Sequence, residues 1–281
     1  MHGAEAAFVG GDIDFTERDF ERLCALIYAQ AGIALSQSKR QMAYSRVGRR
    51  LRALGLDSFR VYLDRLEAHR DSPEWQEFTN ALTTNLTAFF REQHHFPVLA
   101  ELLQRAGSRG KITLWCSAAS TGEEPYSMAM TAIDVLGSRA SMVRILATDV
   151  DTNVLRTAGE AIYSMDRIEK LPADRTRRYF LKGSGARAGF ARVRDEVRDL
   201  IVFRPLNLLH ENWPIREPLD AIFCRNVMIY FNKETQTKIL DRFAPLLRRD
   251  GLLFAGHSEN FFYNCRETFR IRGKTVYELA L

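Results

Sequence analysis

The chain has 281 residues, 46% of them hydrophobic, so it can bury the core of one large domain, or of one domain and a smaller partner. Four scattered cysteines without a CxxC pair argue against a disulfide framework or a zinc site. The lack of a signal peptide and of any apolar run near the roughly 18 residues of a membrane span predicts a cytoplasmic protein. The net charge of +5 favours an acidic partner, a class that includes nucleic acids, anionic membranes and acidic protein surfaces.

The first part of the chain is predicted to be helical. Residues 1–14 are expected to form a flexible arm, and residues 15–84 contain several helices and no convincing strand. Large apolar side chains mark the core face of the first helix: Phe20, Leu23, Ile27 and Tyr28. We therefore expect a small all-α domain ahead of the rest of the chain.

A second helix is predicted over residues 36–54, and its charge is one-sided, because this stretch has six basic side chains and no acid. Its apolar positions form one stripe: Tyr44, Val47, Leu51 and Leu54. Arg46, Arg49 and Arg50 are expected to project from the other side into solvent. Solvated surfaces usually mix both signs of charge, so we interpret this basic face as a substrate-binding surface. The alternative is a face that is merely solvated.

The stretch from Ile112 to Met130 is predicted to be a buried strand, a turn of small residues and a helix, which is typical of a cofactor cradle. Ser120 and Thr121 are expected to cap the helix, since each has a glutamate three positions later. Strand–turn–helix units that bind no ligand are also common, and only Gly122 remains of a dinucleotide fingerprint. The cradle is therefore a hypothesis that depends on the neighbouring strands.

Three more apolar strands are predicted, at residues 143–147, 201–204 and 219–224. Polar side chains follow them: Asp149, Asn207, Arg225 and Asn226. Alternating strands and helices indicate a mainly parallel sheet, whose ligands bind beyond the carboxyl ends of the strands. There Asp149 is placed to accept hydrogen bonds from a ribose diol. The cradle has no lysine or arginine for a pyrophosphate, so a nucleoside without phosphates, such as S-adenosylmethionine, fits better than NAD or ATP.

The remaining segments complete the α/β pattern. Residues 152–180 are predicted to be helical, and the glycine-rich stretch 181–203 is predicted to be a small antiparallel insert. A helix over residues 233–249 leads to the strand GLLFAG and then to a last strand near residues 275–279.

Five stretches resemble, in order, the successive motifs of the CheR-type chemotaxis receptor methyltransferases: LTTNLTAFFRE, STGEEPYS, ATDVD, IFCRNVMIYF and LLFAGHSEN. The resemblance runs from about residue 15 to residue 279. It implies a Rossmann-like class I S-adenosylmethionine-dependent methyltransferase domain over residues 85–281. An antiparallel β-subdomain is expected within it at about 176–203, and an all-α substrate-recognition domain over residues 15–84. The implied activity is glutamate O-methylation, which yields glutamyl methyl esters and S-adenosylhomocysteine for sensory adaptation.

The matching motifs imply nine cofactor-binding residues: Asn85, Thr87, Arg91, Glu124, Asp149, Asn207, Leu208, Arg225 and Asn226. Arg91 and Tyr230 match positions beside the transferred methyl group, so the resemblance implies that both are catalytic. Glu124 would hold the methionine amino group, and Asp149 would hold the ribose. The adenine would lie beside residues 207–208.

The resemblance also implies contacts with receptors. Gly183, Gly185 and Gly189 have the GxGxxxG spacing of relatives that bind a pentapeptide at receptor C-termini, and a hairpin turn without a ligand is the alternative. The basic face of residues 36–54 would meet the acidic methylation helices of the receptor. We expect a monomer that acts on the cytoplasmic domains of chemoreceptors, with no metal, no nucleic acid and no membrane insertion.

Two other functions stay open on the sequence. A nucleic-acid methyltransferase would also explain the basic helix. However, base N-methylation commonly uses a polar-Pro-Pro-aromatic strand end and cytosine C5 chemistry a Pro-Cys nucleophile, and neither is present. A non-catalytic sensor or scaffold is opposed only by the presence of both Arg91 and Tyr230.

Overall fold

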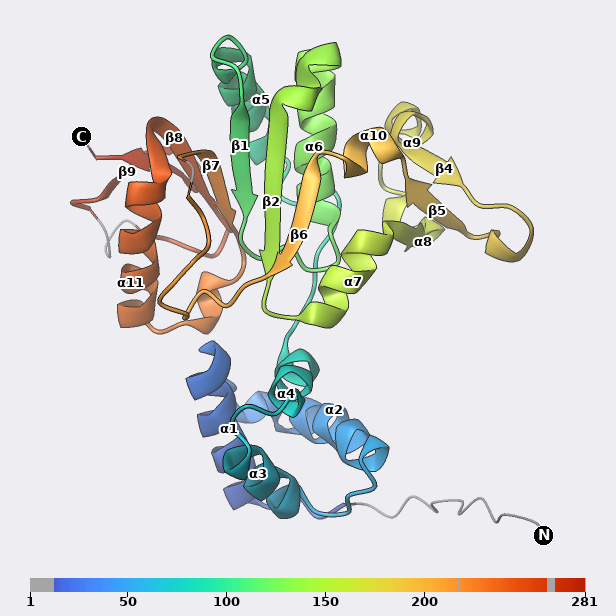
Figure 1. The fold of residues 1–281 in the computed structure, drawn as a ribbon, viewed down its shortest axis with the longest axis vertical. Coiled ribbons are helices and arrows are strands. Elements are labelled where there is room, and N and C mark those ends of the chain that lie inside the picture. The colour runs from blue at the N-terminus through green and yellow to red at the C-terminus, as the bar shows by residue number, and fades with distance from the viewer. Residues whose placement is uncertain (1–12, 217, 262–265, 281) are drawn as a thin grey trace. The chain divides into compact units, whose positions relative to one another are not determined.

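The computed structural model describes three stretches of the chain: residues 13–216, 218–261 and 266–280. The chain divides into two compact units, Met1–Thr83 and Thr84–Leu281, which are described separately (Figure 1). Most of the predicted flexible arm, residues 1–14, lies outside the described residues. Among the described residues, no helix combines the length and the apolar character needed to cross a membrane.

The first unit is helical. Its elements are α1 (Glu17–Ala31), the 3-10 turn η1 (Gln37–Lys39), α2 (Arg40–Ala53), α3 (Phe59–Ala68) and α4 (Glu74–Leu82). A capping box between Thr16 and Asp19 begins α1, and Gly32 ends it in a left-handed conformation at φ 69°. The predicted core face of α1 is buried except at Tyr28, which is 40% exposed. The prediction for Tyr28 is wrong because it lies about 100° around the helix from the buried Ile27.

The second unit is built on a seven-stranded sheet with the order β6-β2-β1-β7-β8-β10-β9. Its strands are β1 (Ile112–Cys116), β2 (Val143–Asp149), β6 (Ile201–Pro205), β7 (Leu219–Cys224), β8 (Leu247–Ala255), β9 (Phe269–Gly273) and β10 (Val276–Leu279). The first five in spatial order are parallel, and β10 runs antiparallel to both of its neighbours, β8 and β9. The strand order reverses at β1, which is the switch point where sheets of this type bind ligands. The predicted mainly parallel α/β fold is therefore confirmed.

Helices cover both faces of this sheet (Figure 1). They are α5 (His95–Ala106), α6 (Glu123–Leu136), α7 (Thr152–Glu160), α10 (Asp195–Arg198) and α11 (Lys233–Phe243). The central strand β1 is buried on both sides, because Leu114 packs in one core with Leu99 of α5 and Trp115 packs in the other with Phe243 of α11. This double burial fixes the carboxyl end of β1, from which the cradle begins.

A second, antiparallel sheet in this unit has the strand order β3-β5-β4. The elements around it are β3 (Ile162–Ser164), α8 (Met165–Ile168), α9 (Ala173–Tyr179), β4 (Phe180–Lys182), η3 (Gly185–Arg187) and β5 (Phe190–Val193). The predicted antiparallel insert exists, but the helix predicted over residues 152–180 is wrong, because Ala161 ends α7 at φ 58° and β3 follows. Residues 201–203 were predicted both as the end of the insert and within the strand 201–204 of the large sheet. The second prediction is the correct one, because residues 201–205 form β6 and pair with β2.

The helix predicted over residues 233–249 is wrong at its C-terminal end. Asn232 caps α11, which ends at Phe243, and the 3-10 turn η5 (Ala244–Leu246) contains Pro245. Proline lacks the N–H that a continuing helix needs. The chain therefore turns directly into β8 at Leu247.

Candidate active site

The cradle lies between β1 and α6, where Gly122 is the N-cap residue of α6 in a left-handed conformation at φ 99°. A Cβ atom on Gly122 would lie 2.8 Å from the Tyr163 hydroxyl and 2.9 Å from the Cβ of Ala158, so no larger residue fits without movement. The Tyr163 hydroxyl, on β3, donates to the carbonyl of Thr121 at 2.6 Å. The small sheet therefore forms one wall of the cradle.

The prediction that Ser120 and Thr121 cap α6 is wrong, because both side chains are engaged elsewhere. The Ser120 N–H donates to Asp149 at 2.8 Å, and its hydroxyl donates to the carbonyl of Asn85 at 3.1 Å. The Thr121 hydroxyl donates to the Glu123 carboxylate at 2.7 Å. The cradle is thus joined to the end of β2 and to the segment that precedes α5.

Asp149, predicted to bind the ribose, ends β2 beside the cradle and is buried. Its Oδ2 accepts the Ser120 N–H at 2.8 Å and its Oδ1 accepts the Asp151 N–H at 2.9 Å. Burial raises the pKa of Asp149 to about 6, although these N–H groups act in the opposite direction. The backbone therefore fixes the carboxylate at the strand end, where its ionised form can accept hydroxyl donors.

The segment that begins at Asn85 is held against the cradle. The side-chain amide of Asn85 donates to Asp151 Oδ2 at 2.8 Å. Its backbone carbonyl accepts a hydrogen bond from the Ser120 hydroxyl. Thr87 follows and is partly buried. The structure thus brings the predicted cofactor residues Asn85 and Asp149 to the same turn.

Arg91 stands between two residues in the left-handed region, Phe90 at φ 51° and Glu92 at φ 55°. The Phe90 N–H donates to the Ser127 hydroxyl on α6 at 2.9 Å, and the Arg91 guanidinium donates to the carbonyl of Leu86 at 2.8 Å. Such backbone conformations persist where the surroundings enforce them, often at functional sites. The Arg91 side chain is partly exposed and has further N–H donors available for a ligand.

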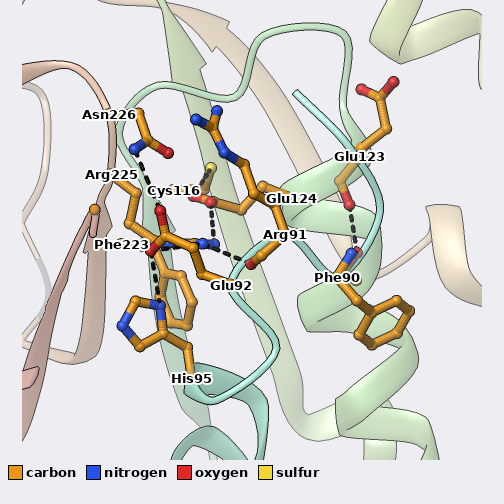
Figure 2. A network of polar contacts seen from close by, with 12 residues as sticks. Phe90, Arg91, Glu92, His95, Cys116, Glu123, Glu124, Phe223, Arg225 and Asn226 are labelled. Atoms are coloured by element: carbon orange, nitrogen blue, oxygen red, sulfur yellow. Dashed lines mark hydrogen bonds and ion pairs between the residues drawn. The ribbon is translucent and has the colours of Figure 1, made fainter. Parts of the chain in front are cut away.

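Arg225, after β7, is the centre of a buried polar network (Figure 2). Its Nη1 lies 2.6 Å from Glu124 Oε2, and its Nη2 lies 3.2 Å from Glu92 Oε2 and 2.6 Å from the carbonyl of Arg91. The sequence predicted Arg225 and Glu124 as separate cofactor contacts, whereas the structure pairs them. Glu92 was missed, although it is the last residue of the motif LTTNLTAFFRE.

The two carboxylates in this network have opposite pKa shifts. Burial raises the pKa of Glu124 despite the nearby Arg225 and the thiol of Cys116, which donates to its Oε1 at 3.3 Å. Burial also opposes ionisation of Glu92, but the His257 N–H and the charge of Arg225 outweigh it, so the pKa of Glu92 is lowered. The Arg225 Nε is buried without a partner among the described atoms. The Arg225 Nε can therefore donate to the carboxylate of an amino-acid moiety. Glu124, whose charge Arg225 compensates only in part, can accept hydrogen bonds from its ammonium group.

Glu92, His94 and His95 place ligand atoms within 4.8 Å of one another, a spacing that could hold a metal ion. His95 is fully buried, its Nε2 lies 2.8 Å from the Thr275 hydroxyl, and burial and the nearby Arg225 lower its pKa to about 3. The same Arg225 charge that disfavours protonated His95 opposes a divalent cation at Glu92. We therefore assign no metal to this cluster.

The ends of β6 and β7 carry the other predicted contacts. Asn207 and Leu208 are buried, and the Asn207 Oδ1 accepts the Leu209 N–H at 2.9 Å. Asn226 adopts φ 58° and donates to Glu92 at 3.3 Å. Tyr230, partly buried, ends the 3-10 turn η4 (Met228–Tyr230). All predicted catalytic and cofactor-binding residues thus belong to one unit. Asp149, Asn207 and Arg225 lie at its strand ends, and Asn85 is hydrogen bonded to the cradle.

The predicted basic face of the helical unit is corrected by the structure. Arg50 is not free, because its Nε and Nη2 contact the two oxygens of Glu74 at 2.7 and 2.5 Å. Arg46 donates to the carbonyls of Ala81 and Thr83. These contacts arise because α2 packs on α4. Of the three predicted arginines only Arg49 is exposed.

The glycine-rich stretch forms the loop of the β4–β5 hairpin. A Cβ on Gly183 would lie 2.1 Å from the carbonyl oxygen of Arg187, and Gly185 and Gly189 adopt φ 57° and 88°. The loop's own path therefore requires these glycines, whether or not it binds a ligand. The strand β4 forms one edge of its sheet.

These features together define a class of protein. A mainly parallel sheet with a small-residue turn after β1 and a buried carboxylate at the end of β2 is the arrangement of a Rossmann-like enzyme that binds a nucleoside cofactor. The sequence matches the family models "CheR methyltransferase, SAM binding domain" over residues 85–277 and "CheR methyltransferase, all-alpha domain" over residues 18–83. The chain therefore belongs to the CheR methyltransferase family, and its cofactor is S-adenosylmethionine.

Curated relatives match the sequence of this chain over nearly their whole length. The chemotaxis protein methyltransferase of Salmonella typhimurium is 53% identical over 94% of this chain and 91% of the relative. The Escherichia coli protein of the same name is 51% identical over 94% and 92%. Chemotaxis protein methyltransferase 2 of Pseudomonas aeruginosa is 50% identical over 97% of both chains. The predicted family, fold class and cofactor are confirmed.

Proposed function

We propose that the protein transfers the methyl group of S-adenosylmethionine to glutamate side chains in the cytoplasmic domains of chemoreceptors. The products are glutamyl methyl esters and S-adenosylhomocysteine. The observation that carries this proposal is about 50% identity to chemotaxis protein methyltransferases across both domains. The buried network around Arg225 supports it, because the network leaves one donor for an amino-acid carboxylate.

In this proposal the cofactor lies at the carboxyl ends of β1, β2, β6 and β7, and is held by groups from these strand ends, from α6 and from the segment before α5. Asp149 accepts the ribose hydroxyls, the adenine lies beside residues 207–208, and Glu124 and Arg225 hold the methionine end. Asn85, Thr87 and Asn226 complete the cofactor site in this proposal. When bound, S-adenosylmethionine supplies a methyl group activated by its sulfonium.

The protein's part in the reaction is to position the substrate carboxylate. A glutamate side chain with an ordinary pKa of about 4.3 is already ionised at neutral pH, so no general base is needed. Arg91 and Tyr230 orient this carboxylate toward the methyl group. Orientation of two reacting groups at roughly 3–3.5 Å can account for several kcal/mol of rate enhancement. Arg91 remains hydrogen bonded to Leu86, which favours orientation of the nucleophile over tight neutralisation.

The hairpin β4–β5 serves as a receptor tether in this proposal. An extended receptor C-terminus adds to the edge strand β4 by main-chain hydrogen bonds. Leu181 and Phe190, which are 43% and 47% exposed, flank the loop that contains Gly183, Gly185 and Gly189. Tethering raises the local substrate concentration toward the millimolar range without changing the active site. The enzyme itself acts as a monomer.

The proposal is tested by the chemistry of the product. Purified protein is incubated with methyl-labelled cofactor and either receptor-bearing membranes or RNA, and the product is then treated with mild alkali. Glutamyl esters release volatile methanol, whereas N-methyl groups do not. Base-labile label on the receptor is expected. Label that resists alkali, or that appears on RNA, would favour a nucleic-acid methyltransferase, and no label at all would favour a non-catalytic sensor.

A further inference from the structure

A buried carboxylate, Glu259, holds the loop that follows β7. Its Oε1 accepts the N–H groups of Val227 at 2.9 Å and of Met228 at 2.8 Å. Its Oε2 accepts those of Asn226 at 2.9 Å and of Gly256 at 2.5 Å. Glu259 is only 4% exposed, so these four donors replace solvent around its charge. Burial raises the pKa of Glu259, and the N–H donors act in the opposite direction.

The bonds to Glu259 determine the path of the chain toward Tyr230. Three successive N–H groups can meet one carboxylate only because the loop curls, with Asn226 at φ 58°. The turn η4 starts from these peptides, and the Tyr230 N–H donates to the carbonyl of Val227 at 3.1 Å. On the other side, the Gln236 amide donates to the carbonyl of Met228 at 2.9 Å. The position of Tyr230 therefore depends on peptides that Glu259 holds.

Gly256 shows how closely this loop is packed. A Cβ at Gly256 would lie 2.4 Å from the Asn226 side-chain nitrogen, 2.7 Å from the Asn226 N and 2.7 Å from Glu259 Oε2. Such contacts are too short for any real Cβ atom. The loop after β7 and the loop after β8 thus meet backbone to backbone, with Glu259 between them.

We propose that Glu259 is a positioning residue for methyl transfer, which places Tyr230 at the site by binding the N–H groups of residues 226–228. It contacts neither substrate nor cofactor in this role. The inference rests on the proposed function, because Tyr230 is taken to orient the substrate carboxylate.

The test is Glu259→Gln, which puts an NH₂ group against two N–H donors and so removes two of the four hydrogen bonds. A misplacement of about 1 Å can slow an enzyme about 10²-fold. We therefore expect kcat for receptor methylation to fall about 10- to 100-fold, with little change in KM for the receptor. An unchanged kcat overturns the proposal.

A double-mutant cycle with Tyr230→Phe separates positioning from general destabilisation. If Glu259 acts through the Tyr230 hydroxyl, Glu259→Gln should lower kcat by less than about threefold when Tyr230 is already phenylalanine. A full effect in that background would show that Glu259 acts on something else and would overturn the proposal.

Asp220→Asn is the matched control. Asp220 is also buried, at 3% exposure, and accepts a backbone N–H, that of Thr113 at 2.9 Å, but it lies near the amino ends of β7 and β1. We expect this variant to lose stability and to keep its kcat. A fall in its kcat equal to that of Glu259→Gln would show that loss of any buried carboxylate slows the enzyme, and would overturn the proposal.

A measurement on the wild type covers the case in which Glu259→Gln does not fold. Amide hydrogen exchange should show slow exchange at Val227 and Met228, because their N–H groups donate to a buried carboxylate. Rapid exchange at both would overturn the proposal. The two proposals are also distinguishable: absence of base-labile methylation by the wild type removes the proposed function, whereas an unchanged kcat in an active Glu259→Gln enzyme removes only the role of Glu259.

Discussion

Arginines behave differently in the two units of this protein. Arg225 of the methyltransferase unit is buried and pairs with Glu92 and Glu124, which lie more than 100 residues away in sequence. In the helical unit, Arg50 pairs with Glu74 while its neighbour Arg49 stays exposed. A run of basic residues is therefore not one surface, because partners brought by the fold decide which charges are structural and which are free.

The largest expected loss of stability comes from replacing Arg225, the buried arginine of this comparison. Arg225→Ala leaves the Glu92 and Glu124 carboxylates buried without their cation, a change typically worth about 3–5 kcal/mol of unfolding free energy. Chemical denaturation should show this loss, and calorimetry should show no binding of S-adenosylhomocysteine. As the exposed control, Arg49→Ala should stay within about 0.5 kcal/mol of wild type. Similar small effects of both variants would contradict the buried network.

The next effect in size concerns Asp149. Asp149→Ala should weaken binding of S-adenosylhomocysteine by about 1–3 kcal/mol, the range for hydrogen bonds to a charged group. Calorimetry measures this directly. Unchanged affinity would remove the ribose assignment.

The same carboxylate predicts a pH dependence. Because the pKa of Asp149 is raised to about 6 from its ordinary 3.8, its contribution to stability is fully present below 3.8 and is lost as pH rises through 6. Cofactor binding has the opposite dependence, since only the ionised form accepts both ribose hydroxyls. Affinity for S-adenosylhomocysteine should therefore fall as pH falls through 6. Asp149→Asn should flatten this dependence, and an equal slope in the variant would assign the titration to another group.

Within the helical unit, Arg50 and Arg49 form an adjacent pair for comparison. Arg50→Ala removes a two-pronged contact with Glu74 whose side chains are 29% and 14% exposed. Partial solvent screening reduces its worth to about 1–2 kcal/mol of unfolding free energy. The midpoint of thermal unfolding should be clearly lower for Arg50→Ala than for Arg49→Ala. Equal midpoints would mean that the Arg50–Glu74 pair adds nothing.

The smallest expected effect is on receptor recognition. Arg49 and Arg52 are the exposed arginines in the second half of α2, so their change to glutamate leaves the packing intact. Each exposed pair is worth less than about 1 kcal/mol, so receptor methylation should slow about three- to tenfold at 0.1 M salt. The loss should fade at 1 M salt, where the Debye length falls from about 10 to 3 Å. Full activity of the double variant at low salt would show a merely solvated face.

The sequence predicted well those features that depend on order along the chain. Asp149, Asn207 and Arg225 each follow an apolar strand, so a parallel sheet necessarily brings them to one edge. The pairing of Arg225 with Glu92 and Glu124 was not predictable in this way, because both partners lie more than 100 residues from Arg225 in the sequence.

Short-range errors have different causes. β3 has only three residues, too few for a period of two to be visible beside the helical stretch that precedes it. Arg46 and Arg50 were placed outward by helical periodicity alone, which carries no information about α4. In both cases the neighbouring elements, and not the local sequence, decide the outcome.

The wall that Tyr163 provides for the cradle limits how freely the small sheet can be exchanged. Its ring and that of Phe180 also pack edge-on against Phe89, at centroid distances of 4.9 and 5.4 Å, within the main core. The three strands are thus a fixed part of the enzyme and not a detachable module. A chimera that tests the proposed receptor tether would have to graft only the loop of residues 183–189, because transplanting the whole sheet would replace the residue that closes over Gly122.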